Sequence, residues 1–437
     1  MGYDPFTTGL AGLAAMFALI VLHVPIGVAM GVVGLVGTAL IIGWGPALTL
    51  AGTEPSSAMS SESFAVIALF LLMGNLAYAG GLAGELYRLS WAFLGRFKGG
   101  LALATIGACG GFGAVCGSSV ATTATMSRIA LPEMRARGYD SALAAGAIAS
   151  GGTLGMIIPP SIVLILYGVL TENPITPLFL AAIGPGLLAV ALYLIAISLV
   201  VRMKPHLAPE PERVSGRDMV SAVRECWAVL LLAVAVSGGI YSGFFTVSEA
   251  AAVGATIALG LAMLRGRLSW KTFVECLGDT ASSTALIFLI IIGASIFSYF
   301  ATLSGLPAAA VGFIESLQLS PIMVILLLQV MYLILGAIFD TIAAMVLTLP
   351  FVYPLVTGMG YDPIWWGVVN IVVIELGMIT PPIGINVFVL HGMAKDLPLP
   401  TIFKGVTPYI AADLVRLATL IFFPPLALWL PASAGWL

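Results

Sequence analysis

The sequence contains very little charge for its length. Only 8% of its 437 residues are Asp, Glu, Lys or Arg, whereas 60% are hydrophobic. Soluble globular proteins carry about 25% charged residues. A soluble core could not enclose this much apolar surface, so the composition excludes a water-soluble globular protein and indicates that lipid is the solvent.

Residues for metal, redox or nucleotide chemistry are also scarce. The chain has four cysteines without a C-x-x-C spacing, so we expect them to be small apolar residues inside helices. No G-x-x-x-x-G-K-[ST] motif is present, which excludes ATP hydrolysis by a P-loop. Charged rings that would line a channel are sparse, and no acid–base motif of an intramembrane enzyme is found. A channel and an enzyme are therefore the weaker alternatives, and no nucleic-acid partner is expected.

The sequence has instead a series of apolar runs of roughly 20 residues, the length that crosses a bilayer core about 30 Å thick. These runs predict an all-α polytopic membrane protein with about ten spanning helices. Two further stretches, residues 100–131 and 322–350, are interrupted by Gly, Ser, Thr and Pro, and we interpret them as re-entrant hairpins. Spans are expected near residues 7–24, 25–50, 63–82, 141–170, 178–201, 226–243, 247–264, 278–303, 363–390 and 407–432.

The positions of the basic residues support this topology. If neither hairpin crosses the membrane, 16 of the 17 Lys and Arg residues fall on one side. The remaining Arg416 lies in the last span, three residues after Asp413, where the two can pair on one helix face. The positive-inside rule makes the basic side the cytoplasm and places both termini outside. The loops expected on the outer side are residues 51–62, 171–177, 304–320 and 351–362.

An internal repeat divides the chain. Gly-Tyr-Asp at residues 138–140 recurs at 360–362, and Pro-Pro at 159–160 recurs at 381–382, both 222 residues later. Five predicted spans separate the two copies, so the second copy is expected to be inverted, as in secondary transporters whose broken helices meet near the bilayer midplane. We expect a first half over residues 1–201, a cytoplasmic linker with a surface helix over 202–225, and a second half over 226–437.

Both hairpins contain residues that suit a cation site. Gly117 permits a tight tip, and the hydroxyls and carbonyls after it offer oxygen ligands without fixed charge. Gly117 matches Gly336 of the second hairpin at an offset of 219. The second hairpin also carries Asp340, which either binds a cation or holds the tip through backbone N–H groups. Oxygen ligands favour a hard cation such as sodium, and the alternative is that these small residues only pack helices.

The two Pro-Pro pairs are expected to break their helices, in residues 141–170 and 363–390, because proline has no N–H to donate. The break exposes carbonyl oxygens to a cation and begins a half-helix whose positive N-terminus can face a carboxylate. A simple proline kink is the alternative. Glu375 precedes the second break and is a functional candidate like Asp340, although it is expected nearer a helix surface. The candidate cation ligands are Gly117, Ser118, Ser119, Thr122, Gly155, Ile157, Pro159, Gly336, Asp340, Thr341, Gly377, Thr380 and Pro381, and the candidate substrate contacts are Pro160, Ser161, Pro382 and Asn386.

Taken together, these segments resemble the large membrane subunit of tripartite ATP-independent periplasmic (TRAP) transporters. The resemblance covers nearly the whole chain and is most specific at residues 117–122, 132–135, 138–161, 336–341 and 377–386. The sequence departs from the family pattern at Cys116, where a small residue is usual, and at Met156. We expect both to affect packing only.

The resemblance implies a sodium-driven, elevator-type symporter in the bacterial inner membrane. It implies two protein partners, a small four-helix membrane subunit and a periplasmic binding protein that delivers an organic acid anion. No additional four-span segment precedes the first span, so the small subunit is expected to be a separate polypeptide. A related ion-coupled permease without a binding protein is the main alternative. The substrate stays open among C4-dicarboxylates, sialic acid, keto acids and other carboxylates or sulfonates.

Overall fold

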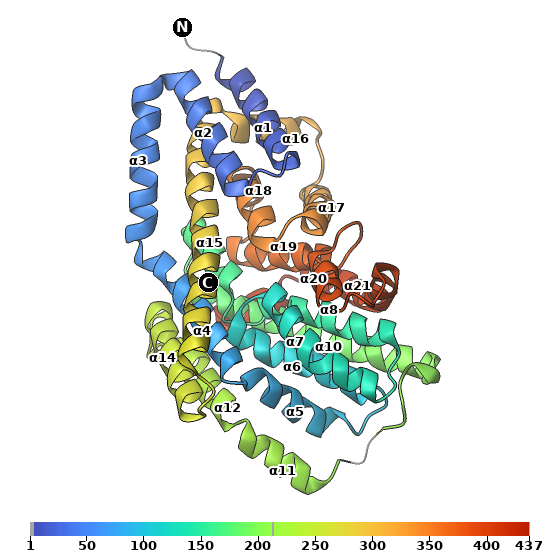
Figure 1. Cartoon of the computed structure of the whole chain (residues 1–437). Coiled ribbons are helices and arrows are strands. Elements are labelled where there is room, and N and C mark those ends of the chain that lie inside the picture. Colours follow the sequence, from blue (N-terminus) through green and yellow to red (C-terminus); the bar gives the residue numbers. More distant parts are fainter. Residues whose placement is uncertain (1–3, 212–213, 437) are drawn as a thin grey trace.

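The computed structural model describes residues 4–211 and 214–436, and all regular structure in these ranges is helical (Figure 1). Within the described residues, 7 helices are long and apolar enough to cross a membrane, or up to 9 if two bent helix pairs each form one span. The predicted all-α polytopic fold is therefore confirmed. The expected number of ten spanning helices and the re-entrant path of the hairpins stay predictions.

One group of helices surrounds the long helix α15, and we call it the outer group. Helices α2 and α4 pack along α15, and α14 packs on α4. Glycine allows this close approach, since a Cβ atom on Gly34 of α2 would lie 2.7 Å from the backbone nitrogen of Phe297 in α15. The outer group comprises α1 (Pro5–Val21), α2 (Ile26–Ile42), α3 (Trp44–Ser60), α4 (Glu62–Ala79), α14 (Val247–Leu264) and α15 (Trp270–Ser304).

A second group, the core group, holds both hairpins and both broken helices. Its centre is α8, which packs against α6, α7 and α21 and is buried from Leu143 to Ile157. Elements of both sequence halves mix in it, because α10 packs on α19, α21 and α22. The core group comprises α6 (Gly100–Cys116), α7 (Ser119–Ala136), α8 (Ser141–Ile157), α9 (Ile162–Leu170), α10 (Ile175–Met203), α17 (Pro321–Ile338), α18 (Thr341–Gly358), α19 (Pro363–Gly377), α20 (Ile385–Met393), α21 (Leu399–Phe422) and α22 (Pro425–Ser433).

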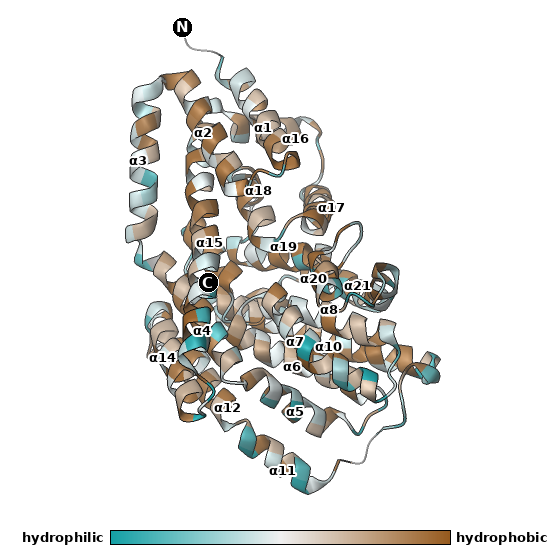
Figure 2. Ribbon diagram, in the orientation of Figure 1, coloured by the Kyte–Doolittle hydropathy of each residue, from teal (hydrophilic) through white to brown (hydrophobic). Residues whose placement is uncertain are grey.

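Shorter elements connect the two groups at their edges. The surface helix expected in the linker is α11, whose first turn is closed by a capping box between Ser215 and Asp218. Figure 2 shows polar residues gathered on α11, in contrast to the apolar helices above it. The connecting elements are α5 (Leu82–Leu94), η1 (Pro205–Leu207), α11 (Gly216–Glu225), α12 (Trp227–Ala233), the π-helical turn η2 (Val234–Gly238), α13 (Gly239–Tyr241) and α16 (Leu306–Ser316).

Several boundaries differ from those expected. The single span predicted over residues 25–50 is two helices, because Gly43 takes a left-handed φ of 96° and ends α2. The loops expected at 51–62, 304–320 and 351–362 are largely helical, within α3, α16 and α18. Hydropathy detects apolar length, but a helix needs only its backbone hydrogen bonds and continues through polar residues.

The structure supports the repeat and revises its register upstream. Asp140 caps α8 by accepting hydrogen bonds from the N–H groups of residues 142 and 143, and Asp362 caps α19 in the same way. The hairpin tips show the same correspondence, since Ser118 is the N-cap of α7 and Asp340 is the N-cap of α18. Both pairs are 222 residues apart, so Ser118 corresponds to Asp340, and the match of Gly117 to Gly336 at 219 is wrong.

Candidate cation and substrate site

The tip of the first hairpin is a two-residue turn between α6 and α7. Gly117 adopts a φ of 62°, and the Ser118 hydroxyl accepts a hydrogen bond from the N–H of Ala121 at 3.3 Å. The Thr122 hydroxyl donates to the Ser118 carbonyl at 2.7 Å. The tip also touches the helix break, because a Cβ atom on Gly117 would lie 3.1 Å from the Pro160 carbonyl oxygen.

The first break supplies carbonyl groups directly beside this tip. Pro159 and Pro160 have no N–H, so the carbonyls of Gly155 and Met156 lack their normal helical donors. A Cβ atom on Gly155 would lie 2.6 Å from the Thr122 hydroxyl and 2.9 Å from the Ser118 carbonyl oxygen. The structure therefore brings uncharged oxygen atoms of Ser118, Thr122 and Gly155 together in one cluster.

The second hairpin meets the second break in a related way. A Cβ atom on Gly377 would lie 2.6 Å from the carbonyl carbon of Gly336, so the two backbones are in contact. The N–H of Gly384, just after the break, donates to the Ala337 carbonyl at 3.0 Å. Asp340 is partly buried at the tip, and its carboxylate interacts with the backbone N–H groups of Ile342 and Ala343 in the first turn of α18. This contact is the one required by the alternative that the carboxylate holds the tip through backbone N–H groups.

Side chains from both halves of the chain meet between the two tips. The Asn386 amide donates to the Ser119 hydroxyl at 2.8 Å and to the Ala149 carbonyl at 3.3 Å. The Thr341 hydroxyl donates to Glu375 Oε1 at 2.5 Å, and Glu375 also interacts with Ser119. Since these residues lie on α7, α8, α18, α19 and α20, one network joins both hairpins to both broken helices.

Glu375 was expected nearer a helix surface, and this expectation is wrong. Its side chain is 1% exposed, and its Oε2 atom has no hydrogen-bond partner among the described residues. Thr153, which lies 222 residues earlier in the repeat, is also buried, so the two copies of the repeat bury equivalent positions. A carboxylate with one unpartnered oxygen therefore lies between the two hairpin tips.

The two breaks differ in exposure. Pro159 and Pro160 are buried, whereas Pro381 and Pro382 are exposed, and both Pro-Pro bonds are cis. Ser161 is also buried, and its hydroxyl caps α9 by accepting from the N–H of residue 164 at 3.4 Å. Of the candidate substrate contacts, the structure leaves Pro382 exposed and buries Pro160, Ser161 and Asn386.

The remaining cation candidates are dispersed around these clusters. Thr380 directs its hydroxyl to the Leu376 carbonyl at 2.7 Å, as a helix-terminal hydrogen bond. Ile157 is the last residue of α8 and Pro159 follows it inside the buried break. Pro381 lies in the exposed break, away from protein cover.

A buried ion pair supports the core group next to this network. Arg416 Nη2 lies 2.9 Å from Asp413 Oδ1, and both side chains are 1% exposed. The Tyr193 hydroxyl donates to Asp413 Oδ2 at 2.6 Å and lies 3.1 Å from the Thr153 hydroxyl. The predicted pairing of Asp413 with Arg416 is confirmed, while its connection through Tyr193 to α8 had no signal in the sequence.

A family model for the DctM component of the tripartite ATP-independent periplasmic transporters matches residues 13–426. The chain belongs to this family. It is therefore a multi-pass membrane transporter subunit of the bacterial inner membrane, and the predictions that it is a TRAP large permease and not an enzyme are confirmed.

Curated relatives with several substrates match most of this permease. The C4-dicarboxylate large permease protein DctM of Pseudomonas aeruginosa is 35% identical, with 90% of this chain and 94% of that protein covered. The sialic acid large permease protein SiaM of Vibrio cholerae is 30% identical over 85% of this chain and 87% of that protein. The isethionate permease protein DctMQ of Oleidesulfovibrio alaskensis is 33% identical over 98% of this chain and 66% of that protein.

A solved structure shares the fold. The crystal structure of the Alcanivorax borkumensis YdaH transporter aligns with a TM-score of 0.59 and 14% sequence identity, covering 90% of each chain. At this identity the likeness concerns the fold alone.

Proposed function

We propose that this permease couples uptake of a small organic acid anion to the sodium gradient. The observation that carries the proposal is the contact of each hairpin tip with a Pro-Pro break. At the first tip, Ser118, Thr122 and Gly155 gather uncharged oxygen atoms in a buried space. Uncharged oxygen ligands suit a hard monovalent cation and are less costly to bury than several carboxylates.

The substrate class is proposed from the relatives. The names of the three relatives reported above contain C4-dicarboxylate, sialic acid and isethionate. All three compounds are organic acids. The second break is exposed at Pro381 and Pro382, and α20 begins directly after it at Ile385. The positive N-terminal end of α20 can therefore face the acid group of such a substrate.

An elevator movement of the core group against the outer group is proposed as the transport step. Helices pack more extensively within each group than between the two groups. The main contacts between the groups are those of α4 with α6 and of α15 with α18. A crevice of about 590 Å³ lies where α15 meets α18, lined by Ser298, Thr302 and Tyr353 among others. Such a boundary suits sliding of one group along the other.

The partners are also proposed from the family. A periplasmic binding protein would deliver the anion, and a small membrane subunit would complete the complex. The relative named DctMQ extends well beyond the region that this chain matches. In this proposal the side of the permease that carries the basic residues faces the cytoplasm, and both termini face the periplasm.

Sodium coupling is tested by uptake into proteoliposomes that contain the permease with its partner proteins. Uptake is measured with a sodium gradient, a potassium gradient or a proton gradient alone. Only sodium is expected to drive accumulation. Full activity without sodium would refute the coupling.

The ligand assignment is tested with Ser119→Ala and Asp340→Asn. Each substitution removes a hydroxyl or a charge near a tip while nearly conserving shape. A loss of about 1 to 3 kcal/mol would weaken the apparent sodium affinity by roughly fivefold to over a hundredfold. Uptake is measured against sodium concentration at matched amounts of monodisperse protein. If both variants keep the normal sodium dependence, these side chains only support packing.

A further inference from the structure

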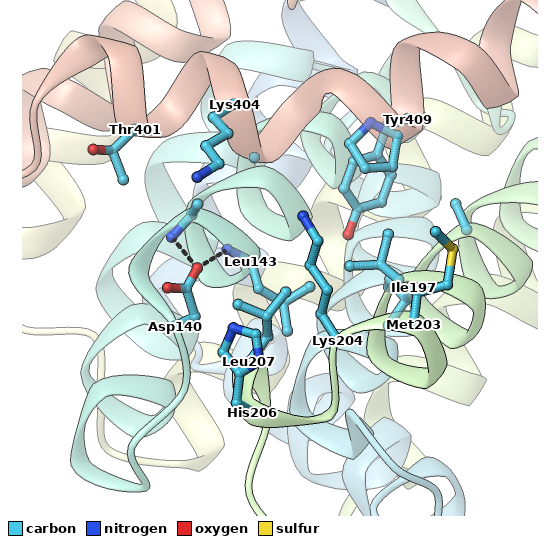
Figure 3. Close-up of a pocket in the computed structure, with 15 residues that line it drawn as sticks. Asp140, Leu143, Ile197, Met203, Lys204, His206, Leu207, Thr401, Lys404 and Tyr409 are labelled. Atoms are coloured by element: carbon cyan, nitrogen blue, oxygen red, sulfur yellow. Dashed lines mark hydrogen bonds between the residues drawn. The ribbon is translucent and has the colours of Figure 1, made fainter.

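A separate cavity of about 530 Å³ lies where α10 ends and α21 begins (Figure 3). Asp140, Lys204, His206, Thr401 and Lys404 supply its polar lining. Asp140 begins α8, whose break lies 17 residues further on, a distance of roughly 25 Å along the helix. The cavity is therefore distinct from the proposed transport site.

The cavity carries an excess of positive over negative charge. In Figure 3 the side chains of Lys204, which directly follows α10, and Lys404, which lies on α21, extend into the same space. Among the residues that the structure describes, neither lysine forms an ion pair. The carboxylate nearby, Asp140, is already engaged, since its Oδ1 accepts from the N–H groups of Ala142 at 2.9 Å and Leu143 at 3.1 Å. Two ammonium groups thus face one carboxylate that caps a helix.

The remaining wall of the cavity is largely apolar and continues to an exposed apolar surface of α10. Ala196, Ile197, Val200 and Met203 form a stripe along the last two turns of α10. Met203 is 78% exposed, and Leu199 on the same helix is also exposed. An exposed apolar surface beside a pair of lysines at a helix end matches the boundary between acyl chains and headgroups.

We propose that this cavity binds the headgroup of an anionic phospholipid from the cytoplasmic leaflet. The phosphate would lie between Lys204 and Lys404, His206 and Thr401 would border it, and the start of an acyl chain would follow the apolar stripe of α10. The proposal goes beyond transport and uses only the orientation in which the basic side is cytoplasmic. Basic pockets between membrane helices on that side are suited to anionic headgroups.

The test uses the purified, delipidated permease in detergent and compares three probes. Phosphatidylglycerol, phosphatidylcholine and inorganic phosphate are titrated separately, and binding is followed by native mass spectrometry and by thermal stability. The test variant is Lys204→Gln with Lys404→Gln. The matched control is Lys98→Gln with Lys271→Gln, which removes the same charge from lysines on the basic side outside the cavity.

Phosphatidylglycerol is expected to bind and stabilise the unmodified protein more than phosphatidylcholine does. The test variant should bind phosphatidylglycerol on the order of 30-fold more weakly, which corresponds to two lysines at an anionic surface. The control should bind as the unmodified protein does. If the test variant binds phosphatidylglycerol as the unmodified protein does, the lipid binds elsewhere and the proposal is overturned. If inorganic phosphate alone stabilises the protein as much as phosphatidylglycerol does, the site is one for free anions and the proposal is also overturned. Lys204, Lys271 and Lys404 are exposed and Lys98 is partly exposed, so the substitutions are compatible with folding.

Discussion

Replacing Arg416 by methionine removes the counter-charge of a carboxylate that is buried in the core group. Arg416 lies 2.9 Å from Asp413, and each side chain is 1% exposed, so water cannot replace the lost partner. Breaking one side of a buried pair typically costs 3–5 kcal/mol. We expect Arg416→Met to lower the free energy of unfolding by about 3–5 kcal/mol. Glu375, which also interacts with Arg416, adds to the uncompensated negative charge.

The double variant Asp413→Leu with Arg416→Met separates this charge effect from a loss of packing. Replacing both members of a buried pair by apolar residues of similar volume is often neutral or stabilising. The double variant should therefore recover most of the stability that the single variant loses. Tyr193→Phe serves as an intermediate case, since it removes one hydrogen bond to a charged group, worth about 1.5–3 kcal/mol.

The assay is equilibrium unfolding in mixed detergent micelles, with all variants at the same protein concentration. The unmodified protein, the single variants Asp413→Leu and Arg416→Met, and the double variant form a double-mutant cycle. This cycle gives the coupling energy between positions 413 and 416 directly. A single variant that loses less than about 1 kcal/mol would refute the reasoning, since breaking a desolvated pair must cost more. A double variant that loses the sum of the two single effects would also refute it, because the two charges would then be independent.

Three further predictions address topology, the first cation cluster and the network between the hairpins. In a cysteine-free background, an impermeant thiol reagent should label cysteine at position 360 and not at 138 in intact spheroplasts; equal labelling contradicts the inversion. Gly155→Ala should abolish sodium-dependent uptake, because its Cβ would lie 2.6 Å from the Thr122 hydroxyl, while Gly358→Ala, which has open space, should retain uptake. Asn386→Ala should lower the free energy of unfolding by about 1–3 kcal/mol, because the buried Ser119 hydroxyl and Ala149 carbonyl lose their donor. The measurement is equilibrium unfolding in mixed micelles, and an unchanged stability would show that these two groups find other donors.

Local signals predicted local structure well. Pro159 and Pro160 end α8 as expected, because missing N–H groups act on the preceding turn alone. The sequence Thr246 to Glu249 predicts a capping box, and both of its hydrogen bonds are present, at 2.8 and 3.2 Å. The halves of such a motif lie within one turn, so no distant residue is needed to form it.

Signals that depend on neighbours in space were missed. Glu375 was expected near a surface because the sequence of its own helix does not show which other helices pack against it. In the structure it is buried against Thr341. The hydrogen bond from Asn386 to Ser119 spans 267 residues, and no spacing rule could have linked the two. The predicted match of Gly117 to Gly336 was wrong for a similar reason. Both residues are glycines, but they occupy different positions relative to the tips of their hairpins.

Sequence reasoning alone was enough to recognise a helical membrane protein with two copies of one motif, to locate its helix breaks and to name its transporter family. Apolar length, proline chemistry and short-range capping carry that information within a few residues. The tertiary structure decided which oxygen atoms meet. It brought Ser119, Thr341, Glu375 and Asn386 into one network and left one break covered and the other exposed. These outcomes depend on close packing of helices distant in sequence, where a single glycine sets how closely two backbones approach.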